Sequence, residues 1–377
     1  MKNNKKDKNN KKNKGGSIMS KLLVVLAVFL GIILVAVLGF KLYDYIGAAE
    51  FYNNSEVVFE TPGVADSNFV PQGMAYDEES KTFFFTGYMG KPILGELGDD
   101  IASRVYVRKA DGTVSFTRLL NEDGTPYTDH TGGVEYFGDY VYVTGEDSHG
   151  LDVFSAADIL SGKEETKMLG SVKTYNSPAH TYTFSYNGER YILAGSYHTD
   201  ETVYLTPDHE RFTTPNGDKN TSVMTVFKLS ESAEYGIEPT PVAIISARHM
   251  IQGVCITPDG QMVVSSSWGL ATSNLFFYDL SKVQGGETHK YEGTITYGDL
   301  EDENAERYDE EFSFDVKLYY LDDSCLVNTV VAPPMSEELV CLDGRIIVFC
   351  ESACNKYVFG KLTTGFGTYG YKYETLK

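Results

Sequence analysis

Polar residues that could bind a ligand recur at one kind of position in this sequence, just where a β-patterned run begins. They are Gln72, His130, His180, Gln252, Glu337 and Glu338, in the stretches "PQGM", "HTGGV", "PAHTY", "IQGV" and "SEELV". Imidazoles and carboxylates can hold a divalent cation such as calcium, or share a proton in general acid–base chemistry. Sequence spacing does not decide between these roles, because the residues come from separate repeats.

A second set of candidates lies where such runs end or where loops approach them. It comprises Glu146, Arg248, His249, Trp268 and Glu351. Aromatic residues belong to the same loops, among them Tyr88 and Tyr197. Aromatic rings give apolar contact together with a polar handle, which suits a sugar or peptide ligand.

Five copies of one pattern must position these residues. They are residues 72–88, 132–146, 180–197, 252–268 and 337–351. Each copy has two β-patterned runs around a turn, and three of the turns are Asn187-Gly188, Asp259-Gly260 and Asp343-Gly344. Asn-Gly and Asp-Gly are the dipeptides that tight hairpins prefer, so each copy predicts an antiparallel hairpin.

Further strand-like runs follow the hairpins, for example "SRVYVRKADG", "NLFFYDL" and "KYVFGKL" in third position and "PVAIIS" and "CLVNTVVA" in fourth. Four antiparallel strands that recur along the chain predict an all-β fold, a β-propeller of four-stranded blades. From residue 56 onward the chain resembles the broad β-propeller superfamily, in the style of its gluconolactonase-like and NHL-like groups.

A propeller would gather most of these candidates on one face. The connection that enters the innermost strand of a blade lies on the same face as the connection from its second to its third strand, and we call this the mouth face. The candidates fall in these two kinds of connection, which predicts a ligand site at the channel mouth. A plainer explanation is that loops collect polar residues anyway, while the glycine after Gln72 or Gln252 lets inner strands crowd around the axis.

The resemblance has a further implication for metals. Gluconolactonase-like propellers hold a divalent cation with a Glu at the start of an inner strand and with Asn and Asp residues from other blades. Gln72 stands at that position in the first copy, and Glu338 is the nearest equivalent in the fifth, so Glu338 and His180 are the candidate metal ligands. The departure at Gln72 weakens the case for metal-dependent lactone hydrolysis. The sequence also has no G-x-S-x-G elbow and no glycine-rich phosphate loop.

The number of blades follows from the spacing of the copies. Five blades with insertions are predicted, and the alternative is a sixth, degenerate blade around "YEGTITYGD" and "DVKLYYLDDSCLVNTVVA". The run "SEVVFET", residues 55–61, has no hairpin partner. We expect it to pair as the outer strand of the last blade, because that would close the ring and remove its exposed edges.

An apolar run near the N-terminus predicts a membrane anchor. Residues 22–40 contain no charge and would form about 28 Å of helix, close to the roughly 30 Å thickness of the hydrocarbon layer. Eight lysines lie in residues 1–21, so the positive-inside rule places this end in the cytoplasm. The alternative is a cleaved signal peptide with small residues at Gly47-Ala48-Ala49.

The expected organisation is therefore a disordered basic cytoplasmic tail (residues 1–21), a transmembrane helix (22–41), a linker (42–54) and a propeller outside the membrane (55–377). Without Asp7, Lys41 and the lysines of the tail, 23 Lys and Arg oppose 52 Asp and Glu. So acidic a body repels phosphate backbones, which excludes nucleic acid as a partner. The expected partners are membrane lipid, through the helix, and a small molecule, a glycan or a cell-surface protein.

Five cysteines, an odd number, do not form a disulfide framework, although Cys350 and Cys354 in "CESAC" could pair. Three functions stay open at this stage. The leading one is binding of a small ligand, glycan or peptide at the channel mouth. The others are a metal-assisted hydrolase or lyase that acts on a lactone, ester or sugar, and a non-catalytic scaffold without a pocket.

Overall fold

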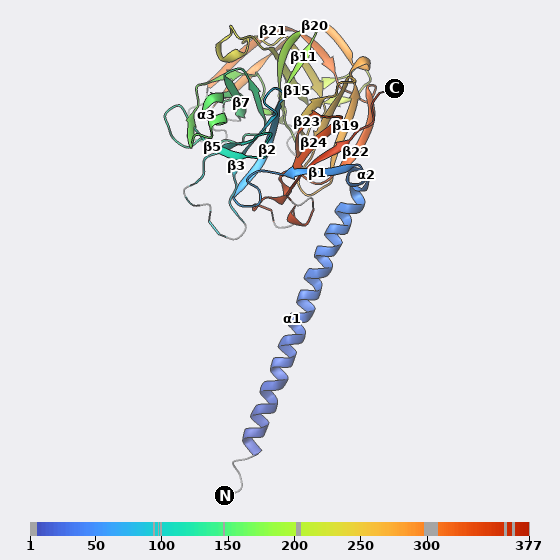
Figure 1. Ribbon diagram of the computed structural model, residues 1–377. Helices are drawn as coiled ribbons and strands as arrows, with labels where there is room; N and C mark the ends of the chain where they lie inside the picture. The colour runs from blue at the N-terminus through green and yellow to red at the C-terminus, as the bar shows by residue number, and fades with distance from the viewer. Residues whose placement is uncertain are drawn as a thin grey trace.

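The chain forms one long helix and a domain built of strands (Figure 1). The computed structural model describes residues 6–376 except 93–94, 97, 99, 146–147, 201–204, 298–307, 358–359 and 364–365, and of residues 6–18 it describes only the backbone. Five sheets are arranged as the blades of a β-propeller, which confirms both the predicted fold and the predicted number of blades.

Blades one and two follow the expected antiparallel order. Blade one contains β2 (Phe69–Asp77), β3 (Thr82–Met89), β4 (Arg104–Arg108) and β5 (Val114–Leu120), to which β9 (Glu165–Lys167) adds in parallel. Blade two contains β6 (Val134–Phe137), β7 (Tyr140–Gly145), β8 (Gly150–Ser155) and β10 (Gly170–Lys173). A short helix, α3 (Ala156–Ser161), lies between β8 and β9; it begins at the cap Ser155 and ends at Gly162, whose φ is 69°.

Blade three carries the largest addition. Its four strands are β11 (Pro178–Tyr186), β12 (Glu189–Ser196), β15 (Ser222–Lys228) and β16 (Ala243–Ala247). A long hairpin, β20 (Gln284–Tyr297) and β21 (Tyr308–Tyr320), then extends the sheet because β21 pairs in parallel with β16. The segments considered for a sixth blade therefore form this hairpin and the fourth strand of blade four, so that alternative is wrong.

Blades four and five complete the ring. Blade four contains β17 (Ile251–Ile256), β18 (Gln261–Ser266), β19 (Ser273–Asp279) and β22 (Leu326–Ala332). Blade five contains β23 (Ser336–Leu342), β24 (Arg345–Cys350), β25 (Gly367–Lys372) and, as its outer strand, β1 (Ser55–Glu60). Antiparallel pairing of β1 with β25 confirms the expected closure of the ring by the strand from the N-terminal side.

Shorter elements decorate the connections. They are the pair β13 (Phe212–Thr213) and β14 (Lys219–Asn220), and the 3-10 turns η2 (Asp208–Glu210), η3 (Glu234–Gly236), η4 (Leu280–Lys282), η5 (Glu351–Ala353) and η6 (Gly360–Leu362). The apolar core lies between the blades, since alternate residues of each strand face the neighbouring blade. The largest fully buried side chains include Tyr142, Phe84 and Phe277.

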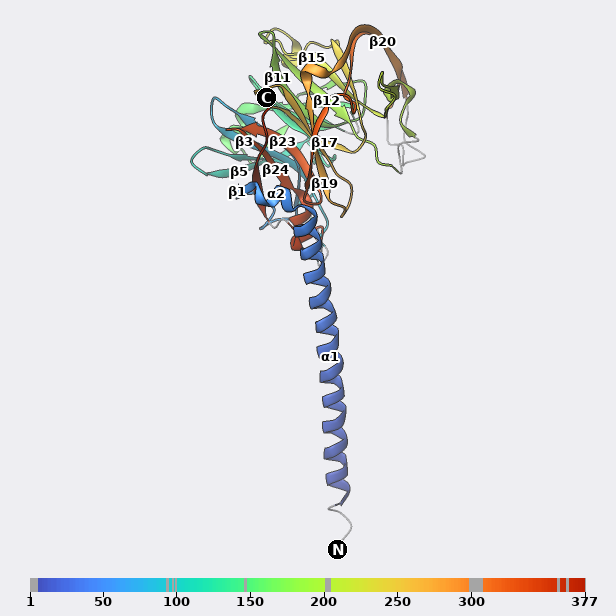
Figure 2. The same cartoon turned by 90° about the vertical axis from the view of Figure 1, so that its right-hand side faces the viewer.

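The N-terminal part is more continuous with the domain than the sequence suggested. Helix α1 (Lys6–Gly47) includes residues 6–21 of the basic segment expected to be disordered and part of the expected linker, and it projects from the propeller as a single rod (Figure 2). Its portion Met19–Gly47 is long and apolar enough to cross a membrane. The next helix, α2 (Ala49–Asn53), packs into the core because Ala48 and Phe51 are fully buried between blades four and five.

None of the five cysteines forms a disulfide in the structure, and Cys350 and Cys354 are not paired with each other. Burial raises the pKa of Cys354 to about 12, which keeps the thiol protonated and unreactive at neutral pH. Cys255 is fully buried in the core between blades four and five.

Candidate ligand-binding pocket

Four of the five inner strands depart from regular pairing at the level of the channel mouth. The irregularities lie between Pro71 and Gly73 in β2, Pro178 and His180 in β11, Ile251 and Gly253 in β17, and Ser336 and Leu339 in β23. A bulge re-aims the side chain of the extra residue. The residues in the first three bulges are Gln72, Ala179 and Gln252, and all three line a pocket at the mouth.

Glycines beside the bulges allow the inner strands to approach one another. A Cβ on Gly73 would lie 2.7 Å from the backbone nitrogen of Val134, and a Cβ on Gly253 would lie 2.3 Å from the Cα of Glu338. No side chain fits at either position. The architectural role expected for these glycines is thereby confirmed, and the variable residue before each one is left to face the pocket.

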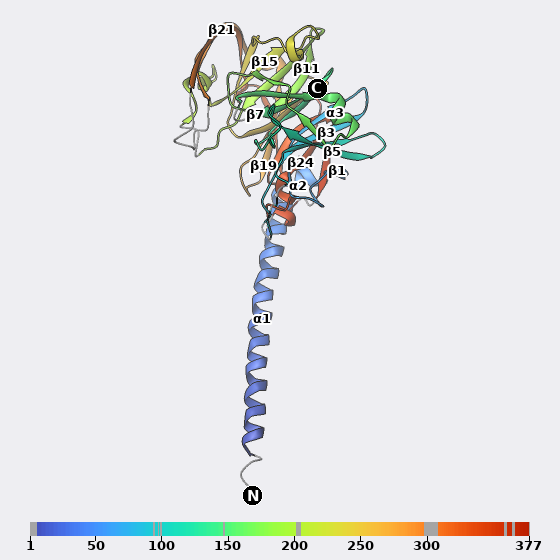
Figure 3. The same ribbon diagram turned by 90° about the vertical axis from the view of Figure 1, so that its left-hand side faces the viewer.

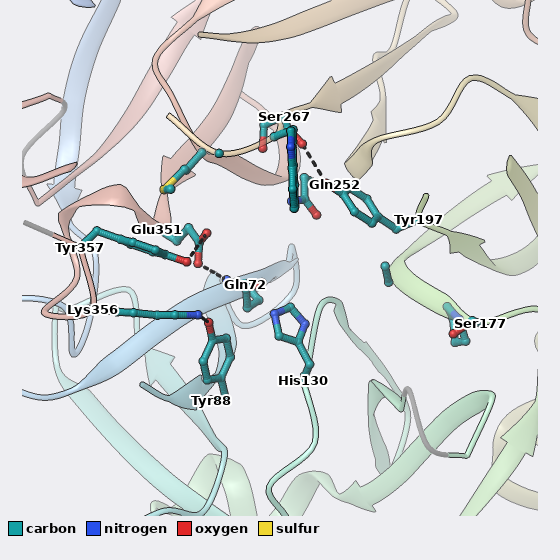
Figure 4. Close-up of a pocket in the computed structure, with 15 residues that line it drawn as sticks. Gln72, Tyr88, His130, Ser177, Tyr197, Gln252, Ser267, Glu351, Lys356 and Tyr357 are labelled. Carbon is teal, nitrogen blue, oxygen red and sulfur yellow. Dashed lines mark hydrogen bonds between the residues drawn. The ribbon is translucent and has the colours of Figure 1, made fainter. Parts of the chain in front are cut away.

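The pocket has a volume of about 550 Å³ and receives residues from all five blades (Figure 4). Its lining residues are Gln72, Tyr88, His130, Ser177, Pro178, Ala179, Tyr197, Gln252, Ser267, Trp268, Gly269, Met335, Glu351, Lys356 and Tyr357. Glu351 and Lys356 are the only charged residues among these lining residues. The pocket therefore combines polar groups with apolar and aromatic walls and has little net charge.

Glu351 is the hydrogen-bonded centre of the pocket floor. Its Oε2 accepts from Gln72 Nε2 at 2.7 Å, and its Oε1 accepts from Tyr357 Oη at 3.2 Å (Figure 4). Burial raises the pKa of Glu351, while the Lys356 ammonium and these two donors act in the opposite direction. The carboxyl group therefore titrates close to neutral pH instead of staying ionised.

A second carboxyl group, that of Glu337, lies beside this floor. Its side chain is 1% exposed, and its Oε1 has no hydrogen-bond partner among the residues that the structure describes. Burial and then the charge of Glu351 raise the pKa of Glu337 well above its ordinary value. Ionising two neighbouring buried carboxyl groups costs desolvation and charge repulsion for both. Glu337 and Glu351 therefore form a pair that retains a proton.

The wall next to Glu351 and Tyr357 combines a cation with two rings (Figure 4). Lys356 Nζ contacts Tyr88 Oη, and the ring of Tyr88 lies 4.8 Å from the ring of His130 (Figure 4). Desolvation by the walls and then the Lys356 charge lower the pKa of His130. His130 is therefore a neutral imidazole at physiological pH, able to donate one hydrogen bond and accept another.

The pocket rim is formed by the connection between β18 and β19. Tyr197 Oη donates to the carbonyl of Ser267 at 3.2 Å, which ties blade three to this rim. Trp268 follows directly and is 51% exposed. A large exposed ring at the edge of a polar cavity provides a flat apolar surface for whatever binds there.

The structure brings five of the sequence-predicted residues into this pocket, namely Gln72, His130, Gln252, Trp268 and Glu351. Glu337 is buried and does not line the pocket, although its charge raises the pKa values of the lining residues Tyr88 and Tyr197. Glu146 lies outside the described residues. The remaining four predicted residues have other surroundings.

Glu338 lies at the propeller axis rather than in the pocket. Its Oε2 accepts the backbone N–H groups of Met74 at 2.8 Å and Val134 at 3.2 Å, and its Oε1 accepts that of Thr181 at 3.0 Å. The carboxylate thus joins the inner strands of blades one, two and three to blade five. His180 is fully buried and packs over Gly195, where a Cβ would lie 2.0 Å from Nε2.

Arg248 and His249 lie in the connection before β17 and outside the pocket lining. The Arg248 guanidinium is 3.7 Å from the centre of the Phe276 ring, an arrangement that anchors the loop by a cation–π contact. His249 Nε2 is within hydrogen-bond distance of Asp200 Oδ1. Both residues therefore have partners in blades three and four, Phe276 in β19 and Asp200 in the connection after β12.

Sequence reasoning missed Lys356 and Tyr357. They follow "CESAC" in the connection between the second and third strands of blade five, which is the same kind of connection that holds Trp268. The sequence pattern assigns them to the third strand of the last blade, in "KYVFGKL", but that strand is β25, so the assignment is wrong and the two residues belong to the connection before it. Tyr88 and Tyr197, expected near the mouth from their places after second strands, do line the pocket.

Comparison with known proteins does not identify the function of this chain. No family model and no curated protein matches this chain. Among solved structures it is similar to a putative oxidoreductase (glucose dehydrogenase) from Thermus thermophilus, with 11% identity over 84% of this chain and 98% of that one and a TM-score of 0.38. An aldose sugar dehydrogenase from Streptomyces coelicolor, solved with PQQ bound, gives 10% identity over 84% and 96% of the two chains and a TM-score of 0.38. Neither likeness carries information on activity.

The residues at the axis do not fit the divalent cation implied by the gluconolactonase-like resemblance. Both oxygens of Glu338 are directed at backbone N–H donors, which would compete with a cation for the same lone pairs. His180 lies in the core and does not face the cavity. Within the described ranges, no group of three or more His, Cys, Asp or Glu side chains is arranged to hold a metal ion.

A second cavity, of about 600 Å³, opens on the opposite face of the propeller. Acidic side chains line it, namely Asp77, Glu78, Glu79 and Glu135, together with Arg190. Its buried carboxyl group, that of Glu135, is engaged by the backbone N–H of Thr183 at 2.9 Å and by the Thr183 hydroxyl at 3.0 Å. The buried carboxyl group of this cavity thus has structural partners, and the mouth-face pocket is the better candidate site.

Proposed function

We propose that this protein is a membrane-anchored binding protein whose mouth-face pocket takes a small, uncharged, hydroxyl-rich ligand such as a sugar. The observation that carries the proposal is the pocket floor, where Glu351 meets Gln72 and Tyr357 above the buried Glu337. A sugar hydroxyl both donates and accepts hydrogen bonds, so it can bridge a half-protonated carboxyl pair and amide groups. Tyr88, Tyr197 and Trp268 supply flat surfaces for the apolar face of a sugar ring.

The charges of the pocket favour an uncharged ligand. An anion that reached the floor would meet the Glu337 and Glu351 pair, and a cation would meet Lys356 at the rim. A scaffold that used only the outer surfaces of the blades would need no cavity of this size and no buried acids beneath it.

The membrane anchor rests on the span Met19–Gly47 and on the way in which it joins the domain. Ala48 and Phe51 are fully buried in the propeller core, so signal-peptidase cleavage next to Ala49 would have to cut within a packed segment. Retention of the helix is therefore the simpler interpretation. The lysines of residues 1–21 then favour a cytoplasmic N-terminus and a propeller on the outer side of the membrane.

Binding of sugars to the full chain in detergent micelles tests the proposal. Trp268 is the only tryptophan, so its emission reports directly on the pocket rim while monosaccharides and disaccharides are titrated. Gln72→Ala removes a donor to Glu351 and should weaken binding about tenfold, which corresponds to about 1.4 kcal/mol. Glu79→Gln, at the opposite mouth of the channel, is the matched control and should bind as the wild type does. Absence of saturable binding across the whole panel would refute the proposal.

A second candidate function is favoured by the carboxyl pair itself. Two buried acids that share a proton provide an acid and a base in one site, which is the requirement for hydrolysis or elimination at a lactone, ester or sugar. Glu351→Gln should then abolish turnover of lactones, aryl esters or glycosides while the substrate still binds. If the wild-type chain turns over none of these substrates, binding remains and catalysis is rejected.

A further inference from the structure

The membrane-spanning helix ends against the same loops that form the rim of the pocket. Gly47, the last residue of α1, lies so close to Thr272 that a Cβ on the glycine would be 3.1 Å from the threonine methyl group. Thr272 belongs to the connection between β18 and β19, which also contributes Trp268 to the rim. The upper end of the helix and one side of the pocket mouth are therefore neighbours.

A second loop also places the end of α1 beside the mouth of the pocket. Helix α1 contacts η6, which belongs to the connection between β24 and β25. That connection supplies Lys356 and Tyr357 to the pocket. Figure 3 and Figure 1 show the segments after β24 beside the upper end of α1, on the side from which the helix leaves the propeller.

Packed side chains hold the helix in this direction. Phe51 is fully buried and stacks on Tyr371 with ring centres 5.6 Å apart. Tyr52 Oη donates to Asp44 Oδ2 at 2.6 Å, and the ring of Tyr52 stacks on that of Tyr45. These contacts join the last turns of α1 to blade five, so the helix is not attached through a flexible linker.

The connection between the apolar run and the domain is short. The uncharged run ends at Phe40, and Gly47 follows seven residues later, which is about 10 Å of helix. A helix that crosses a bilayer therefore leaves little room between the lipid headgroups and the mouth face of the propeller.

The rim has the composition of a surface that touches lipid headgroups. Trp268 is 51% exposed, and Leu270 and Ile101 are each 38% exposed on mouth-face loops. Tyr43 and Tyr45 are exposed at the end of the helix, and tryptophan and tyrosine are enriched at membrane interfaces.

Lysines are also concentrated near this junction, although the body of the chain is acidic. Lys356 and Lys361 lie in the connection that meets the helix, and Lys41 follows the apolar run. Lys91 lies near Lys356 as well, and it is paired with Glu96 at 3.5 Å. Exposed lysines beside a membrane helix attract anionic phosphate groups of lipids.

We infer that the pocket mouth opens against the bilayer and that the pocket receives the hydroxyl-rich headgroup of a lipid from the same membrane. In this arrangement the headgroup reaches the floor at Glu351, Lys356 lies at the level of the lipid phosphate, and the acyl chains stay in the bilayer. The inference rests on the proposed binding of an uncharged, hydroxyl-rich ligand in this pocket, and it adds the source of that ligand.

The single tryptophan allows a direct test with the full chain reconstituted in phosphatidylcholine vesicles. A lipid with a nitroxide on its headgroup should quench most of the Trp268 emission, whereas aqueous iodide should quench little. The matched control moves the reporter to the opposite face, as Trp268→Phe with Tyr186→Trp, because Tyr186 is 64% exposed at the far end of blade three. That control should be quenched by iodide and not by the labelled lipid. Quenching of Trp268 by iodide alone would overturn the inference.

A second measurement separates this inference from the proposed function. Vesicles that contain a phosphatidyl-polyol or a glycosylated lipid should shift the Trp268 emission, and Gln72→Ala should raise the lipid content needed for half of the shift about tenfold. If soluble sugars bind in micelles but the labelled lipid does not quench Trp268, the pocket binds its ligand from solution and only the inference fails. If Trp268 is quenched but neither sugars nor lipids shift its emission, the proposed function fails and the lipid-headgroup assignment fails with it.

Discussion

Replacement of Glu338 tests how the propeller is held closed, because this one carboxylate joins four of the five blades. Its oxygens accept three buried backbone N–H groups, two on Oε2 and one on Oε1. Glu338→Gln keeps one oxygen for Met74 and Val134 but turns an amide nitrogen toward the N–H of Thr181. One unsatisfied buried donor costs about 1–3 kcal/mol. Glu338→Ala leaves all three unsatisfied and should cost about 3–9 kcal/mol by the same measure.

The larger value is comparable to the whole stability of a typical domain, about 5–15 kcal/mol, so the alanine variant should be unfolded or nearly so. Urea unfolding of the full chain in detergent micelles, followed by near-ultraviolet circular dichroism, measures both changes. Glu231→Gln is the control because Glu231 is exposed on a loop. If Glu338→Gln and Glu338→Ala both unfold within about 0.5 kcal/mol of the wild type, as surface changes do, the assigned role of this carboxylate is wrong.

Three more predictions concern stability. The raised pKa of Glu351 means that the folded state binds the carboxyl proton more tightly than the unfolded state does. The stability that this group contributes is therefore fully present below about pH 4.5 and is lost as the pH rises through about 7. Glu351→Gln should flatten this part of a profile of melting temperature against pH. Gly195→Ala should destabilise the protein by about 1–3 kcal/mol in urea unfolding, because the new methyl group would collide with His180. If this collision is the cause, adding His180→Ala should recover part of the lost stability. Phe51→Ala should lower the free energy of unfolding by about 3–5 kcal/mol in the same experiment. Tyr43→Ala, at an exposed position, is the control and should change this free energy little. Equal effects of the two variants would contradict the packing of α2 into the core.

The sequence was sufficient for the fold because the repeats were visible as alternating runs around Asn-Gly and Asp-Gly turns. The partner of the run at residues 55–61 could also be predicted, since an unpaired strand and an incomplete last blade imply each other. The position of the β20–β21 hairpin could not be predicted. It depends on the parallel pairing of β21 with β16, which no local pattern encodes.

The candidate site was predicted in outline but not in its chemistry. Glu337 and Glu338 are adjacent and looked equivalent, yet the irregular start of β23 leaves one beneath the pocket and directs the other to backbone donors at the axis. A shift of one residue changes which face a side chain takes, and the sequence does not reveal where pairing is irregular. Lys356 and Tyr357 were not found because the β-patterned run "KYVFGKL" predicted the third strand of the last blade, whereas that strand is β25 and the two residues precede it in a connection.

Closure of blade five by β1 has a consequence for how the chain is made. Thr61 and Thr368, whose side chains hydrogen-bond at 2.9 Å beside this seam, are 307 residues apart. At a synthesis rate of about 5–20 residues per second, roughly 15 to 60 seconds separate them on the ribosome. During that time β1 has an unpaired edge, and blade five cannot form. The nascent chain therefore depends on protection of this edge until its last strand arrives.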